Sequence, residues 1–248
     1  MMFLRMAQVG GNSARAPSPY VTDVWRTTEG ATRQLIVSVD PGRMRDPSAL
    51  VILEKFVCDR QRVVTTKFNH IPAVIRSRQI NRYAVVNAHR YPTGTTYPEL
   101  VERVSQVMRQ LPPRMERPRL ILDATGVGRP VSDLFRQSGL QPFDVVLTGG
   151  NAAVRTDTGA SVPKQDIVAT LDAILSDGRL TITGQADASE VLRSELEDFQ
   201  SGRTARGHET FAASGARHDD TVMALATGLW AAERNENVRL GTFGLWSR

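Results

Sequence analysis

The order of hydrophobic segments constrains the fold of this chain more than any other feature of its sequence. Three segments with the composition of strands come first, joined by short connections, and helical segments alternate with strands after them. This order predicts an α/β fold, in which helices flank a mixed sheet. The early strands are expected at 33–40, 48–57 and 61–69, with a turn at Asp59-Arg60, and a shorter strand at 83–92.

The remaining segments complete the expected sheet and its helical layers. Apolar residues at helical spacing predict helices at 97–111, 129–139, 164–178, 189–200 and from 219 onward. Buried or short apolar runs predict strands at 118–126, 143–150, 179–183 and, at an edge, 208–213. We expect residues 1–33 to form a flexible leader or linker, 34–234 one domain, and 235–248 a C-terminal tail.

Composition narrows the class of protein. The 248 residues carry a net charge of +5, and their 31 basic side chains are almost all arginine. Arginine forks bind phosphate oxygens in pairs, which suits a nucleic-acid partner, although a genome rich in G and C would enrich arginine as well. The single cysteine, Cys58, excludes an internal disulfide and a thiolate zinc cluster. The apolar runs are too short to cross a membrane, so we expect a cytoplasmic protein without a membrane partner.

Acidic residues stand at the ends of three expected elements. Asp40 closes the strand "LIVSVD", Asp123 closes "RLILD", and Asp219-Asp220 precede an apolar helix. If the two strands are neighbours, all four carboxylates reach one edge of the sheet. Such a set without matching bases suits two Mg²⁺ or Mn²⁺ ions, which hydrolyse phosphodiester bonds in many enzymes. In this hypothesis Asp40 bridges both ions.

Each acid also has a purely structural explanation. Asp40 precedes Pro-Gly and could be a turn residue, and Asp123 could cap the turn that follows it. The pair Asp219-Asp220 could cap the helix, because acidic side chains are stabilised by the free N–H groups of a first turn. One acid suffices for that role, and a second adds repulsion.

Several motifs give the chain a family resemblance. The segments "VSVDPG", "LILDATGVGRPVSDLFR", "LTGGN", "VPKQDIVATLDAILSDGRLTI", "LRSELEDF" and "ARHDDTVMALATGLWAA" resemble, in order, the nuclease domain of the large terminase subunit of tailed bacteriophages. The resemblance implies an RNase H-like fold and metal-dependent cleavage of double-stranded DNA during genome packaging in a bacterial host cell. It places Asp40, Asp123, Asp219 and Asp220 at the catalytic, metal-binding positions.

One departure from that family concerns the motor. Large terminases also carry an ATPase, whereas this sequence has no G-x-x-x-x-G-K-[ST] phosphate loop. We therefore expect any packaging ATPase, small terminase subunit or portal to be a separate partner. Two other hypotheses remain open: a Holliday-junction resolvase or RNase H-like nuclease with another substrate, and a non-catalytic DNA-binding prophage remnant.

Basic residues are candidates for contact with DNA. Arg76, Arg78 and Arg82 lie within "IRSRQINRY", which could follow a DNA backbone or form a solvated strand edge. Arg129 follows glycines that resemble a phosphate-binding turn but also suit a plain tight turn. Lys164 begins a helix and could contact a phosphate or be solvated. His218 could act as a base or metal ligand, or simply lie on the surface.

Overall fold

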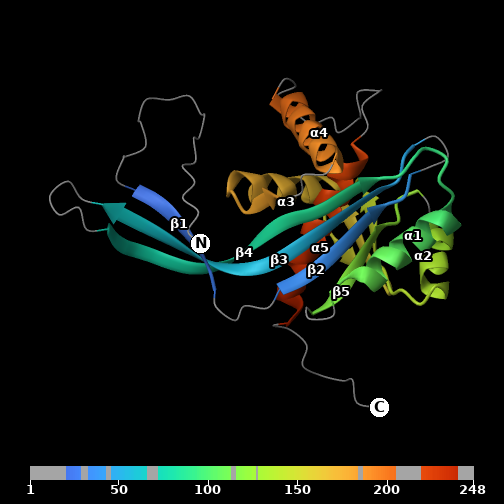
Figure 1. Ribbon diagram of the computed structural model, residues 1–248, viewed down its shortest axis with the longest axis horizontal. Coiled ribbons are helices and arrows are strands. Elements are labelled where there is room, and N and C mark those ends of the chain that lie inside the picture. The colour runs from blue at the N-terminus through green and yellow to red at the C-terminus, as the bar shows by residue number, and fades with distance from the viewer. Residues whose placement is uncertain are drawn as a thin grey trace, which may run out of the picture.

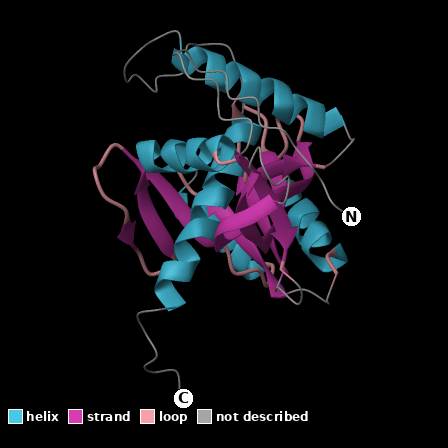
Figure 2. Ribbon diagram, turned by 90° about the vertical axis from the view of Figure 1, so that its left-hand side faces the viewer, coloured by secondary structure: helices cyan, strands magenta, loops and turns pink. Residues whose placement is uncertain are grey.

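The structure is a computed structural model that describes residues 21–28, 33–42, 46–65, 72–112, 116–126, 128–183, 187–204 and 219–239. Within these residues it is an α/β fold, in which a sheet of nine strands is flanked by five helices. The predicted fold class is confirmed, and the arrangement is compatible with an RNase H-like fold. Figure 2 shows helices on both sides of the sheet.

The strand order places the N-terminal meander beside the parallel strands. It runs β7-β8-β6-β5-β2-β3-β4-β9, and β1 pairs with β3 outside this path. Strand β3 is antiparallel to both β2 and β4, whereas β5 lies parallel to β2 on its other side. The strands are β1 (Val21–Thr27), β2 (Arg33–Asp40), β3 (Ala49–Thr65), β4 (Pro72–Arg90), β5 (Glu116–Asp123), β6 (Phe143–Thr148), β7 (Val154–Arg155), β8 (Gly159–Pro163) and β9 (Leu180–Ile182).

Alternating side chains divide the core between the two faces of the sheet. Along β2, Leu35, Val37 and Val39 pack with α1 and α2, whereas Ile36 packs on the opposite face with α3, α4 and α5. Asp40 follows Ile36 at even spacing and therefore belongs to the α5 face. The helices are α1 (Tyr97–Gln110), α2 (Gly128–Gln137), α3 (Lys164–Ser176), α4 (Asp187–Thr204) and α5 (Asp220–Arg239).

Helix α5 is buried on all sides for most of its length. Every residue from 221 to 232 is buried, which explains its small and apolar sequence. The helix packs closest to the sheet at Gly228, where an added Cβ would lie 2.9 Å from the Ser38 Cβ and 3.1 Å from a Leu53 methyl. Glycine at this position therefore lets α5 lie against β2 and β3.

The largest differences from the sequence prediction concern β1, β3 and β4. Asp59-Arg60 is not a turn, because β3 continues to Thr65, and β4 begins at Pro72 rather than at residue 83. Residues 21–27, which we assigned to the leader, form β1 and pair with β3 from Cys58 onward. Figure 1 shows β1, β3 and β4 extending together to the left, beyond the other strands.

The other differences are smaller. The hairpin of β7 and β8 was not predicted, and α5 extends to Arg239, past the expected boundary at residue 234. The edge strand expected at 208–213 lies outside the described residues. The predicted helices at 97–111, 129–139, 164–178 and 189–200 are present with shifted ends, as α1 to α4.

The contact at Gly228 generates a stability prediction. We expect Gly228→Ala to lower the free energy of unfolding by about 1–3 kcal/mol through overpacking, although alanine has the higher helix propensity. Gly149→Ala is the control, because a Cβ there would meet nothing within 4 Å. Urea denaturation measures both variants. A Gly228→Ala protein as stable as the parent would contradict close packing at this point.

Candidate functional site

Asp40 and Asp123 lie side by side at the carboxyl ends of β2 and β5. These strands are parallel neighbours, and Val39 is the register partner of Leu122, one residue before each aspartate. Asp123 is buried and Asp40 is half-buried. The condition on which the sequence hypothesis depended, that the two strands be adjacent, is therefore met. In an α/β sheet this edge is where ligands bind.

Asp219 and Asp220 stand at the start of α5. Asp219 precedes the helix and its carbonyl oxygen accepts the Met223 N–H at 2.8 Å, whereas Asp220 is the first helical residue. Another acid, Glu195 of α4, caps this helix: its carboxylate accepts the N–H groups of Thr221 at 3.2 Å and Val222 at 3.4 Å. The capping function considered for the aspartate pair is thus performed by Glu195 at these two N–H groups.

The charges of the other three aspartates all affect the pKa of Asp40. Burial raises the pKa of Asp40 well above its usual range, and the charges of Asp123, Asp220 and Asp219 raise it further. The Lys164 ammonium at the start of α3 opposes this increase in the pKa. The structure thus places the other three predicted acids and Lys164 within electrostatic range of Asp40.

Asp123 is held by a local turn. Burial raises its pKa, while the backbone N–H of Thr125, 2.8 Å from Oδ1, and the Lys164 charge lower it. The turn continues through Gly126, which has a φ of 75° in the region that favours glycine. This conformation accounts for the glycine after "DAT" without a bound phosphate.

The donor set fits a divalent cation in kind but is not gathered into a coordination cage. Crowded carboxylates with few neighbouring cations are the ligands that Mg²⁺ and Mn²⁺ prefer. In the described part of the chain, however, no three His, Cys, Asp or Glu side chains lie close enough to hold an ion together. The Asp220 carboxylate instead contacts Arg90 at 3.2 Å.

Arg90 and Glu195 are residues of the site that the sequence hypothesis missed. Arg90, the last residue of β4, contacts Asp220 and lies 3.6 Å from the Glu195 carboxylate. It therefore links β4, α4 and the start of α5. The segment "LRSELEDF" carried Glu195 into the family resemblance, but no local pattern indicates that it caps a helix 26 residues later.

The arginines expected to contact DNA lie elsewhere. Arg78 is exposed and Arg82 donates to the Gly178 carbonyl at 3.3 Å, both on the part of β4 remote from Arg90. The backbone of Arg76 pairs with Arg62, but its side chain and that of Arg129 are outside the described set, as is the whole of His218. Of the basic candidates whose side chains are described, Lys164 is the one that lies beside the acids.

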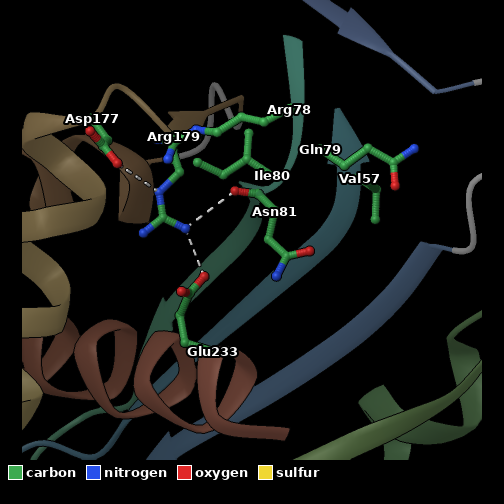
Figure 3. A pocket seen from close by; sticks show the side chains of 8 residues that line it. All are labelled: Val57, Arg78, Gln79, Ile80, Asn81, Asp177, Arg179 and Glu233. Carbon is green, nitrogen blue, oxygen red and sulfur yellow. Dashed lines mark hydrogen bonds and ion pairs between the residues drawn. The ribbon is translucent and has the colours of Figure 1, made fainter. Parts of the chain in front are cut away.

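A cavity of about 480 Å³ lies away from the acids, between β4, the segment that leads into β9 and the far end of α5. Figure 3 shows Arg179 at its centre, with contacts to Asp177, the Asn81 carbonyl and Glu233. The charge of Arg179 is compensated by the two carboxylates, and Arg78 of β4 also lines the cavity.

Comparison with known proteins adds no family to this description. No protein-family model matches the chain, and no curated protein matches its sequence. Among the described residues, no helix has the length and apolar character required to span a membrane.

The raised pKa of Asp40 predicts a pH dependence of stability without metal. A carboxyl with a higher pKa in the folded state stabilises the fold at low pH, and this contribution is lost as the pH rises through the folded pKa. We therefore expect Asp40→Asn to become increasingly more stable than the parent as the pH rises from about 4 to about 8. Melting temperatures in EDTA measure the difference. A gap that stays constant with pH would refute the crowding of Asp40.

The capping of α5 by Glu195 gives a second prediction. Glu195→Ala leaves two N–H groups and Arg90 without this carboxylate, and we expect it to lower the free energy of unfolding by about 1–2 kcal/mol. Glu197→Ala is the matched control on the same helix, because Glu197 is exposed. We expect the control to change stability by less than about 0.5 kcal/mol. Equal losses in urea denaturation would argue against the cap.

Proposed function

We propose that this protein is a metal-dependent endonuclease that hydrolyses phosphodiester bonds of double-stranded DNA. The observation that carries the proposal is the convergence of four aspartates on the carboxyl edge of the sheet, where the charges of the other three raise the pKa of Asp40. The fold, which is compatible with an RNase H-like arrangement, and the resemblance to terminase nuclease domains support the same function.

The electrostatic composition of the site favours a cation-binding function over an internal ion-pair network. In an ion-pair network, basic groups lower the pKa of the acids, whereas Asp40 and Asp123 both have raised pKa values. Burying like charges in one place destabilises the fold unless a cation compensates them. Arg90 already contacts Asp220 and Glu195, which leaves the two strand-end aspartates without a comparable arginine contact among the described ion pairs.

The residues divide the chemistry between two sides. Asp40 and Asp123 would hold ions from the strand ends, and Asp219 and Asp220 from the start of α5. Bound Mg²⁺ or Mn²⁺ supplies activation of water and stabilisation of the leaving oxygen. Glu195 and Arg90 position the first turn of α5, and with it the aspartate pair. Lys164 provides a positive charge beside the acids, suited to a phosphate oxygen.

The family resemblance extends the proposal to a biological setting. A nuclease of this kind would cut DNA during genome packaging in the cytoplasm of a bacterial host, with a packaging ATPase, small terminase subunit or portal as separate partners. These partners follow from the resemblance alone and stay predictions. Cleavage assays with branched DNA and with RNA–DNA hybrids, beside plain duplex, distinguish the resolvase and RNase H-like alternatives.

Substitution of the aspartate pair tests the proposal. We expect Asp219→Asn and Asp220→Asn each to slow Mn²⁺-dependent nicking of plasmid DNA by at least about tenfold and to reduce the melting-temperature increase that Mn²⁺ causes. Without metal, both variants should be at least as stable as the parent, because one repelling charge is gone. Nicking time courses and melting curves, each with Mn²⁺ and with EDTA, provide the data.

The control for this experiment is Asp133→Asn, on the exposed side of α2. This variant should nick at the parental rate and keep the full Mn²⁺ shift. If both site variants do the same, the aspartate pair is not a metal ligand. Cleavage by the parent in EDTA would exclude the metal-dependent mechanism as a whole.

A further inference from the structure

Strands β1, β3 and β4 form an arm that extends beyond the body of the sheet. Strand β2 ends its pairing with β3 at Arg33 and Phe56, and beyond this point β3 pairs with β1 and β4 only. We define the arm as β1 together with residues 56–65 of β3 and 72–82 of β4. It is the part that extends to the left in Figure 1.

The register of the arm gathers arginines on one face. Arg62 lies between Asp23 and Arg76, and Arg60 lies between Trp25 and Arg78. Directly paired residues share a face of a sheet, as do residues two apart along a strand. Arg82, the partner of Phe56, belongs to the same face. Among the side chains that the structure describes, the arginine face thus comprises Arg60, Arg62, Arg78 and Arg82.

The opposite face of the arm has no such excess of charge. Its only arginine within the paired strands is Arg26, which lies opposite Asp59, and the neighbouring positions carry Gln61, Gln79 and Asn81. The asymmetry follows from the alternation of the sequences "CDRQR" and "RSRQINR", in which arginines recur at even spacing. A merely solvated ribbon does not require its arginines to share a face.

Carboxylates compensate only part of this charge. Asp23 contacts Arg60 at 2.7 Å and Arg62 at 3.6 Å, and Asp177 lies 3.5 Å from Arg60. In the described ion pairs, two carboxylates thus stand beside a face on which four arginine side chains are described. Arg62 keeps 51% of its side chain exposed, and Arg78 is exposed as well.

Trp25 orders the centre of the arginine face. The guanidinium of Arg60 lies 5.1 Å and that of Arg82 4.9 Å from the centre of its indole ring. Stacking on an aromatic face fixes the planar forks, so that less side-chain entropy is lost when they bind an anion. The face is therefore partly organised before any ligand arrives.

The shape of the array indicates a linear polyanion rather than a single phosphate. From the row of Arg62 to the row of Arg82, the arginines cover six residues of β3, or about 20 Å at about 3.3 Å per residue. In the cavity nearby, Arg179 is paired with Glu233 at 2.7 Å, and Arg78 of the arginine face lies on the wall of this cavity (Figure 3). A row of phosphates along a nucleic-acid backbone matches such a surface.

This face is separate from the acids in position along β3. Ala49 pairs with Asp40, and Arg60 lies eleven residues further along β3, about 36 Å away at the usual rise of a strand. Arg60 contacts Asp177 at the end of α3 that is opposite to Lys164, so a whole helix separates it from the acids.

We propose that the arginine face of the arm is a second nucleic-acid-binding surface, which holds the phosphate backbone of duplex DNA independently of base sequence and outside the cleavage site. The proposal goes beyond the nuclease function and does not rest on it, because it needs neither the aspartates nor a metal ion.

Binding of duplex DNA in EDTA tests this surface directly. We expect the double variant Arg62→Gln/Arg78→Gln to bind a labelled duplex of about 30 base pairs at least about tenfold more weakly at about 0.1 M salt. The negative slope of log affinity against log salt concentration should become shallower by about 1.8, which corresponds to two lost phosphate contacts. Fluorescence anisotropy with the full chain measures both quantities for several unrelated duplex sequences.

The matched control removes the same charge elsewhere. Arg26→Gln/Arg109→Gln changes one exposed arginine on the opposite face of the arm and one on α1. This control should keep the affinity within about twofold, and all variants should keep the parental melting temperature. If Arg62→Gln/Arg78→Gln unfolds, Arg78→Gln alone replaces it, with an expected slope change of about 0.9.

Three results would overturn the proposal. The first is equal DNA affinity for Arg62→Gln/Arg78→Gln and the control, and the second is failure of the parent to bind duplex in EDTA. The third is a parent protein that binds anionic lipid vesicles instead of duplex and loses this vesicle binding in Arg62→Gln/Arg78→Gln. Nicking of plasmid DNA by the protein in Mn²⁺ is measured separately. A protein that binds duplex through the arm but does not nick DNA would refute the proposed nuclease function and leave the arm proposal intact.

Discussion

Close packing of α5 against β2 and β3 is the contact on which the rest of the site depends. Gly228 lies against Ser38, and Asp40 is two residues beyond Ser38 on the same face of β2. Because a helix is stiff, the position of Gly228 also fixes Asp220, the first residue of α5, which lies about 12 Å from Gly228 along the helix axis. The position of the aspartate pair therefore follows from core packing. Residues 221–232 are buried throughout, which leaves little freedom for the helix to slide.

The same packing imposes an electrostatic cost that the surrounding residues only partly offset. Carboxylates are brought together where burial already raises the pKa of Asp40, and Lys164 is the cation that acts against this. Glu195 and Arg90 compensate differently, because they hold the start of α5 in place through hydrogen bonds and ion pairs. The hydrophobic faces of the sheet provide the stability that tolerates this crowding. Strain confined to one edge of a stable fold is typical of a functional site.

Local patterns predicted what local forces decide. Strand β2 was located at its true bounds, because its apolar run stops at Pro41-Gly42, and the order of helices and strands gave the fold class. Asp59-Arg60 was wrongly predicted as a turn, because its backbone pairs with strands distant in the sequence, β1 and the first part of β4. Glu195 was missed for the same reason, because its partners lie in another helix. The adjacency of Asp40 and Asp123 could be stated only as a condition, which the sheet order then met.

The two charged regions at opposite ends of β3 address different physical problems. A cluster of aspartates repels the phosphate backbone until cations are bound, so it is a poor source of affinity for DNA. Affinity from a remote arginine face would have no such dependence, because no ion pair among the described residues joins Arg60, Arg62 or Arg78 to the four aspartates. Strand β3 is continuous between the two regions, so the proposed arginine face has a fixed place relative to the acids. In this view the long β3 and β4 strands allow the acids to be selected for catalysis alone.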